Sequence, residues 1–173
     1  MPAAGLQYYR RRDYGRRALW ALCQPLWRLS PRWCWGWRNG LLRLFGAQIA
    51  RGVRVYPSAR LIQPWHVRID ESSLISWNVT IYALGPITIG ADCVISQGAH
   101  LCAGSHDPRD PAFPLLRTPI EVDNGVWIAA EAFIGPGVSL GCRAVVGARA
   151  VVCRSVPAGS IVAGNPARVI GSR

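Results

Sequence analysis

The chain has 173 residues, half of them hydrophobic, which suffices for one domain with a buried core and is too few for two domains of ordinary size. All 20 basic residues are arginine, which excludes a lysine nucleophile or a lysine Schiff base. The net charge of +11 lies at the N-terminus, because 12 arginines and only one of the nine acidic residues occur at or before Arg60. The remainder is electrically balanced, so the charge does not indicate nucleic-acid binding and no such partner is expected.

Residues 1–48 form a basic segment rich in tryptophan and arginine. Between Tyr14 and Leu29 the apolar residues have helical spacing, and Pro25 is expected to kink or end that helix. In the aromatic stretch that follows, the spacing fits a helix only after Gly40. Tryptophan with arginine is typical of helices at a membrane surface. Two compatible interpretations stay open: a cap over the end of the following domain, or a peripheral membrane contact through residues 10–45.

A six-residue period begins at Ile49 and runs to about Val156, with an aliphatic residue first and a small residue fifth. Such a repeat is typical of a β-solenoid, in which each unit is too small to bury its own apolar face. Three repeats predict one triangular coil, and glycine at the second position predicts turns with positive φ there. A β-sandwich is the alternative, but it has no fixed six-residue register. The predicted inward residues are Ile49, Val55, Leu61, Ile69, Ile75, Ile81, Ile89, Ile95, Leu101, Val122, Ile128, Ile134, Leu140, Val146 and Val152.

The solenoid domain is predicted over residues 49–173, and its period is interrupted by an insertion at 103–121. Four prolines and a small apolar group fill this stretch, which is expected to project from one corner. His106 lies where the insertion departs from the scaffold. Histidine is the side chain most often used as a general base, so His106 is the candidate to deprotonate a hydroxyl.

The remaining composition bears on metals and location. The histidines are dispersed without a carboxylate cluster, so no metal site is predicted. The six cysteines lack paired or zinc-finger spacing, which favours reduced thiols and a cytoplasmic protein. Neither a secretory signal nor a transmembrane helix is predicted. The expected location is the cytoplasm, with peripheral contact on the inner face of the membrane as an open possibility.

Three ordered motifs resemble the hexapeptide-repeat acyltransferases: S-H-D-x-x-x-P-x-F-P from Ser105, V-W-I-A-A-x-A-F-I-G-P-G-V from Val126, and the closing A-G-N-P-A-R-V-I. Over residues 40–171 the chain is similar to the colanic acid biosynthesis acetyltransferase-like branch, related to the nodulation, maltose and galactoside O-acetyltransferases. The resemblance implies an all-β, left-handed parallel β-helix with an N-terminal helical cap and one projecting loop. It also implies a homotrimer with active sites between subunits, which transfers acetyl from acetyl-CoA to a carbohydrate hydroxyl in polysaccharide or glycolipid biosynthesis.

The resemblance also implies roles for four residues. His106 takes the proton of the acceptor hydroxyl, and Asn78 contacts the acceptor or the developing negative charge. Asn78 is equally suited to a turn between strands. Asp107 is expected to orient the imidazole, to bind a sugar hydroxyl, or only to form a turn before Pro108. Trp127 matches an aromatic residue near the active-site mouth, although it could instead pack beneath the loop.

For acetyl-CoA, the family places small residues along the pantetheine arm, and Ala129, Ala130, Gly147 and Ala148 match those positions. The corners of a solenoid also demand small residues, so this match discriminates poorly. Arg154 and Arg168 match cations that face the nucleotide phosphates. Two alternatives remain: N-acylation of an amino sugar and, from a different class, a non-catalytic β-helix scaffold or membrane-associated binding protein.

Overall fold

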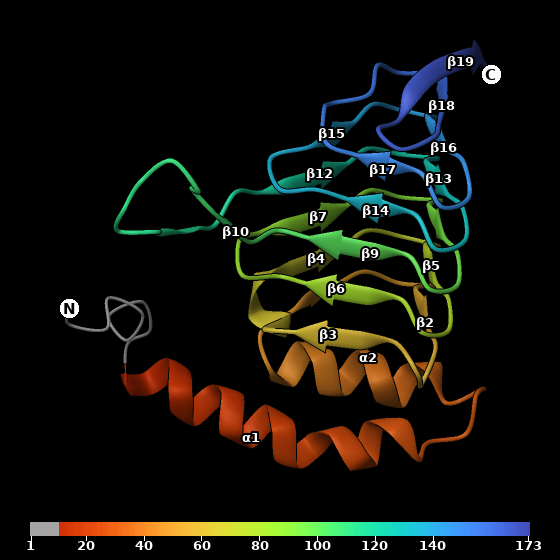
Figure 1. Cartoon of the computed structure of the whole chain (residues 1–173). Helices are drawn as coiled ribbons and strands as arrows, with labels where there is room; N and C mark the ends of the chain where they lie inside the picture. The colour runs from red at the N-terminus through yellow and green to blue at the C-terminus, as the bar shows by residue number, and fades with distance from the viewer. Residues whose placement is uncertain (1–10) are drawn as a thin grey trace.

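A computed structural model describes residues 11–173, with side chains from Asp13 onward. Residues 1–10 of the predicted basic segment lie outside the described residues. Most of the chain is a stack of short strands, with two helices across one end and the C-terminus at the other (Figure 1). The predicted β-solenoid is therefore confirmed.

Each coil contributes one strand to each of three sheets. The first sheet contains β1 (Gln48–Ile49), β4 (Val67–Ile69), β7 (Ile87–Ile89), β12 (Ile120–Val122) and β15 (Ser139–Leu140). The second contains β2 (Arg54–Val55), β5 (Leu74–Ile75), β8 (Val94–Ile95), β13 (Trp127–Ile128), β16 (Val145–Val146), β18 (Ser160–Ala163) and β19 (Arg168–Ser172). The third contains β3 (Arg60–Ile62), β6 (Thr80–Tyr82), β9 (His100–Cys102), β14 (Phe133–Ile134) and β17 (Val151–Val152).

The core is a set of stacked aliphatic columns. The parallel register places Ile49 over Ile69 and Ile69 over Ile89, and the other sheets repeat this arrangement. All fifteen predicted inward residues are buried, as predicted. Because each coil exposes an apolar edge that only the next coil covers, the columns hold the stack in a single register.

The turn prediction was wrong in its position. Gly90 and Gly141, at the second position of the repeat, do not have positive φ; a Cβ there would lie 2.5 Å from atoms of the next coil, so close approach requires glycine. Positive φ occurs instead at the fourth position, where polar residues such as Asp92 (φ 55°) and Glu131 (φ 58°) alternate with glycine. Both residues are exposed, so their side chains lie in solvent where the backbone is left-handed.

Two helices form the N-terminal segment: α1 (Arg11–Arg28) and α2 (Trp35–Leu44). Helix α1 continues through Pro25, so the proline does not end the helix, and Trp20 and Trp27 are buried on either side of it. Helix α2 begins at Trp35 and not after Gly40. Its inward residues include Arg38 and Asn39, which are polar and therefore escape a search for apolar periodicity.

The helices cap the first coil, as one of the two interpretations predicted. The Trp20 indole donates a hydrogen bond to the Leu61 carbonyl at 2.8 Å, and Asn39 donates to the Val53 carbonyl at 2.8 Å. Arg38 is fully buried, and its Nε donates to the Val55 carbonyl at 2.7 Å. These bonds satisfy carbonyls of the first coil that have no earlier coil to pair with, which is the requirement a terminal repeat must meet.

The insertion folds as an antiparallel hairpin of β10 (Ser105–His106) and β11 (Leu115–Leu116), which projects from the side of the solenoid (Figure 1). Because β12 begins at Ile120, the insertion ends slightly earlier than the predicted residue 121. At the C-terminus, β18 and β19 form a second antiparallel pair. Among residues 11–173, no helix combines the length and the hydropathy needed to cross a membrane. All six cysteines are free.

Candidate active site

Both ends of the hairpin rest on one turn of the scaffold, Leu84–Gly85. The Gly85 amide donates to the Ala103 carbonyl at 2.9 Å, just before the chain leaves the solenoid. The returning chain passes so close that a Cβ on Gly85 would lie 2.8 Å from the carbonyl carbon of Arg117 and 2.9 Å from the Thr118 oxygen. The position of the hairpin is therefore set by close backbone packing against a glycine.

His106 is exposed on the hairpin and is oriented by Phe113 from the opposite side of the loop. Its Nδ1 lies 2.9 Å from the Phe113 carbonyl oxygen, and the two rings are stacked with centroids 4.3 Å apart. A carbonyl can only accept, so Nδ1 carries the proton in this contact and Nε2 has the free lone pair. The arrangement presents Nε2 as the basic nitrogen.

Asp107 does not pair with the His106 imidazole through Nδ1, because the Phe113 carbonyl occupies that nitrogen. Its Oδ1 instead accepts a hydrogen bond from the Arg109 amide at 2.9 Å, which is the turn that the sequence allowed as the simple alternative. The Asp107 carboxylate therefore stabilises the bend of the hairpin that carries His106.

Trp127 and Asn78 lie elsewhere on the solenoid. Trp127 begins β13, is 47% exposed, and donates its indole N–H to Ser96 Oγ at 3.0 Å. It therefore covers the outer surface of the second sheet and does not pack beneath the loop. Asn78 is exposed with φ 57°, and its backbone N–H donates a hydrogen bond to Ser58 Oγ at 3.1 Å. The backbone of Asn78 serves as a turn, while its side chain remains available.

The single chain does not bring these residues to one place. Asn78 lies at the corner between the second and third sheets, because it separates β5 from β6. His106 departs from the corner between the third and first sheets, because it follows β9 and precedes β12. The third sheet separates the two corners, so one copy alone does not combine the candidate base with the candidate amide donor.

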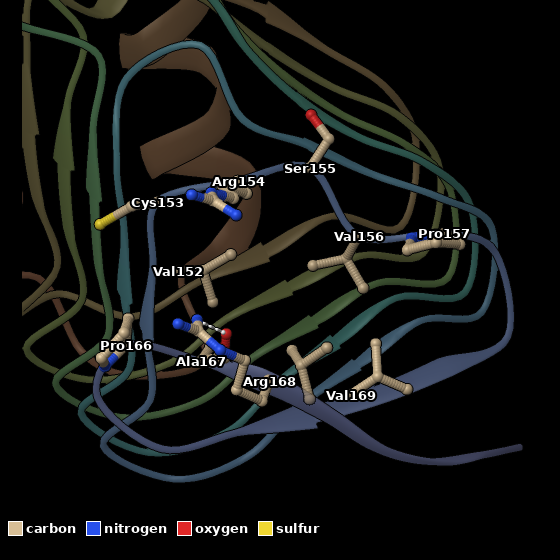
Figure 2. A pocket seen from close by; sticks show the side chains of 11 residues that line it. Val152, Cys153, Arg154, Ser155, Val156, Pro157, Pro166, Ala167, Arg168 and Val169 are labelled. Atoms are coloured by element: carbon tan, nitrogen blue, oxygen red, sulfur yellow. Dashed lines mark hydrogen bonds between the residues drawn. The ribbon is translucent and has the colours of Figure 1, made fainter.

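A pocket of about 350 Å³ lies over the C-terminal end of the solenoid, where its lining includes Val152, Val156 and Val162 from three different sides (Figure 2). Arg154 and Arg168 both line it, from the turn after β17 and from the start of β19. Arg168 Nη1 donates to the Ala167 carbonyl at 2.9 Å, and both arginines are exposed. Two guanidinium groups on one pocket suit phosphate oxygens, which accept several hydrogen bonds from such groups.

The small residues lie at the Asn78 corner, in the next coils toward the C-terminus: Ala129 and Ala130 after β13, and Gly147 and Ala148 after β16. A Cβ on Gly147 would lie 3.0 Å from the Ala163 Cβ, so packing alone explains that glycine. In the described part of the chain, no backbone hydrogen bond uses the amide of Ala130 or Ala148. These two amides are donors on successive coils that a ligand along this edge could use.

The other two histidines have structural environments. His66 Nδ1 lies 2.9 Å from the Ala83 carbonyl, and His100 packs edge-on against Tyr82 and Phe133. Burial lowers the pKa of His100 from its ordinary value, and its Nε2 has no partner among the described residues. Residues 11–173 contain no group of three or more metal-ligating side chains.

Comparisons with known proteins identify the family. WcaF of Escherichia coli K12, a provisionally assigned colanic acid biosynthesis acetyltransferase, is 42% identical over 154 residues, covering 89% of this chain and 85% of its own. The chain belongs to the hexapeptide-repeat acetyltransferase family. Galactoside O-acetyltransferase of the same organism is 29% identical over 140 residues, covering 77% of this chain and 67% of its own. No family model matches the chain.

A solved hexapeptide-repeat acetyltransferase from Vibrio cholerae, in complex with acetyl coenzyme A, superimposes with a TM-score of 0.86. It is 27% identical and covers 94% of this chain and 89% of its own. Membership makes the chain an acyltransferase and confirms the resemblance read from its motifs. Two contacts of the candidate residues were not predicted: Phe113 contacts His106, and Ser96 accepts a hydrogen bond from Trp127. Phe113 stood inside the quoted motif, but only the folded hairpin shows that its carbonyl and ring meet His106.

Proposed function

We propose that this acetyltransferase moves the acetyl group of acetyl-CoA to a hydroxyl of a carbohydrate, in the biosynthesis of a polysaccharide or glycolipid. The observation that carries the proposal is the His106–Phe113 contact, which leaves a basic Nε2 exposed on the projecting hairpin. The relatives named for colanic acid and galactoside acetylation support a sugar as the acceptor. O-acetylation is preferred over N-acylation for the same reason.

In the proposed reaction, His106 Nε2 takes the proton of the acceptor hydroxyl as the oxygen attacks the thioester carbonyl carbon. A carbon–oxygen bond forms, and the carbon–sulfur bond then breaks. The proton held on His106 passes to the departing sulfur, so the thiol of coenzyme A leaves neutral. The Asn78 amide donates to the negative oxygen that develops on the carbonyl. The acceptor is the nucleophile, so no serine or cysteine of the protein has to be acylated.

Acetyl-CoA is proposed to use the C-terminal pocket and the edge that carries the small residues. Arg154 and Arg168 suit the nucleotide phosphates because both guanidinium groups line one pocket. The unused amides of Ala130 and Ala148 suit the amide oxygens of the pantetheine arm, and Ala129 and Gly147 leave room beside them. Trp127 would border the thioester end, because its ring covers the sheet beside these residues.

We propose that the working form is a homotrimer with each site between two copies. The support is the separation of the candidate residues: His106 lies at the corner between the third and first sheets, whereas Asn78 and the small residues lie at the corner between the second and third sheets. Parallel copies that bring unlike corners together would complete the set. We also propose a cytoplasmic protein that contacts the inner face of the membrane peripherally through residues 10–45.

Thiol release from acetyl-CoA, measured while sugars, amino sugars and glycolipids are offered, tests the reaction. His106→Ala is expected to lower acceptor-dependent release by about two to four orders of magnitude, the usual contribution of a general base. His66→Ala is the matched control, since its Nδ1 makes the same kind of carbonyl contact away from the hairpin. Turnover of His106→Ala equal to that of the wild type would refute the assignment. Recovery of activity on mixing His106→Ala with Asn78→Ala chains would support sites shared between copies.

A further inference from the structure

The outer face of the helical cap is apolar. Leu19, Leu22 and Leu26 are spaced three and four residues apart along α1, and Leu29 continues this spacing in the turn directly after the helix, so the four form one stripe. Their exposed fractions run from 55% for Leu19 to 85% for Leu29. We call the basal face the surface formed by this stripe together with the exposed residues Trp33, Trp37 and Leu44.

The basal face is not needed to cap the solenoid. The capping function of α1 is performed by its other side, where Trp20 and Trp27 are buried against the solenoid and pack edge-on at 6.0 Å. Single exposed apolar residues are ordinary, whereas a stripe of four exposed leucines, with two exposed tryptophans in the same capping segment, marks a contact with another apolar phase or partner. Helix α1 thus has one apolar side that packs on the solenoid and a second apolar side that is free to contact another molecule or a membrane.

The positive charge of the N-terminal segment indicates the kind of partner. The segment up to Arg60 holds 12 of the 20 arginines and one acidic residue, while the rest of the chain is balanced. Arg28 is exposed at the end of α1, whereas the guanidinium groups of the exposed Arg32 and Arg43 contact Tyr56 and the Ile49 carbonyl of the first coil. Leucine and tryptophan that enter the headgroup boundary, flanked by arginine, complement an anionic bilayer surface.

A pocket at the edge of the basal face has the matching chemistry. It has a volume of about 360 Å³ and is lined by Arg16, Leu19, Cys23, Leu44 and Phe45. Leu19 and Leu44 also belong to the basal face, so the pocket adjoins it. Arg16 is held there by its contact with the Phe45 carbonyl at 3.3 Å and by its guanidinium, 4.5 Å from the Trp65 ring centroid. Apolar walls beside one fixed cation suit an acyl chain beneath an anionic headgroup.

We propose that the basal face docks on an anionic phospholipid bilayer and that this pocket receives part of a lipid acyl chain. The inference rests on the proposed peripheral membrane contact and names its surface and its lipid. Helix α1 lies at the end of the solenoid opposite the C-terminus, and the hairpin projects from the side (Figure 1). Docking through the basal face therefore leaves His106 and the Arg154–Arg168 pocket uncovered.

Co-sedimentation with vesicles tests the proposal. The full chain is expected to bind phosphatidylglycerol–phosphatidylcholine vesicles and not pure phosphatidylcholine vesicles, with binding weakened by salt. The double variant Leu22→Ser/Leu29→Ser should bind about tenfold more weakly or worse, because two inserted side chains are lost. Ile170→Ser is the matched control: that residue is 67% exposed on β19, at the far end of the solenoid.

A second readout uses the cysteines already present. Cys23 lines the pocket, so anionic vesicles should slow its modification by N-ethylmaleimide, while Cys142, which is exposed and distant in the fold, should react at an unchanged rate. Equal binding to both vesicle types, or unprotected Cys23 on bound vesicles, would overturn the proposal. So would a smaller oligomer in the double variant, because the basal face would then be an interface between copies. Acetyl transfer to a soluble sugar, measured in parallel, should be unchanged, which separates this inference from the proposed reaction.

Discussion

Replacing Gly85 by alanine should move the hairpin that carries His106 without changing a candidate catalytic residue. The added Cβ would lie 2.8 Å from the carbonyl carbon of Arg117 and 2.9 Å from the Thr118 oxygen. Ordinary contact begins near 3.4 Å, so the returning strand must shift by roughly 0.6 Å. Misplacement of a catalytic group by about 1 Å costs about 100-fold, and we therefore expect a loss of about tenfold in kcat. Overpacking should also lower the free energy of unfolding by about 1–3 kcal/mol.

The assay is thiol release from acetyl-CoA together with thermal unfolding. Gly40→Ala is the matched control, because it makes the same chemical change inside α2 where nothing lies within 4 Å of the new Cβ. That variant should keep full turnover and gain about 0.5–1 kcal/mol, since alanine restricts the unfolded chain. Wild-type turnover and an unchanged Tm for Gly85→Ala would refute the view that packing on this glycine positions His106.

Three further predictions concern individual contacts. Phe113→Leu should lower kcat about 2- to 13-fold through loss of about 0.5–1.5 kcal/mol of ring stacking on His106, leave KM for acetyl-CoA unchanged, and be rescued by Phe113→Tyr. Arg154→Ala and Arg168→Ala should each raise KM for acetyl-CoA about tenfold or more at similar kcat, since a charge-assisted bond contributes about 1.5–3 kcal/mol; unchanged KM values would remove both from the phosphate site. Burial lowers the pKa of His100 in the folded state. As the pH falls through the ordinary histidine range, the unfolded chain therefore binds more protons than the folded chain, and the free energy of unfolding should decrease. His100→Phe should flatten this dependence in unfolding curves between pH 7 and 5, and an unaltered slope would contradict the assignment.

The columns of the solenoid were predictable because each repeat has one inward position and that position must be aliphatic. The turns were not predictable, because a glycine can be required either by positive φ or by the close approach of the next coil. Gly90 stands where the next coil approaches, whereas positive φ falls on polar residues such as Asp92. Helix α2 began earlier than expected because Arg38 faces inward and bonds to a first-coil carbonyl. Apolar periodicity cannot detect a cap that works through polar side chains.

The candidate site was predicted residue by residue but not as an arrangement. The motif identified His106, yet its orienting contact comes from a backbone carbonyl seven residues away, and any residue type at position 113 would supply that atom. The stacking of the Phe113 ring is what ties the contact to a side chain. Likewise, the repeat shows that Asn78 and His106 occupy different corners only once the strands are assigned to sheets.

The position of a residue within the coil thus decides which function it can take. Inward residues are committed to the columns, and the strand faces are short, so variable chemistry accumulates at the corners and at the two ends. Corners of one copy point away from each other, which makes a second copy the simplest way to bring Asn78 and His106 together. The N-terminal end must be capped in any case, and once Trp20 and Trp27 cover the coil, the opposite side of α1 is free to differ. Its exposed leucines therefore reflect a demand other than folding, because serine or glutamate there would cap the solenoid equally well.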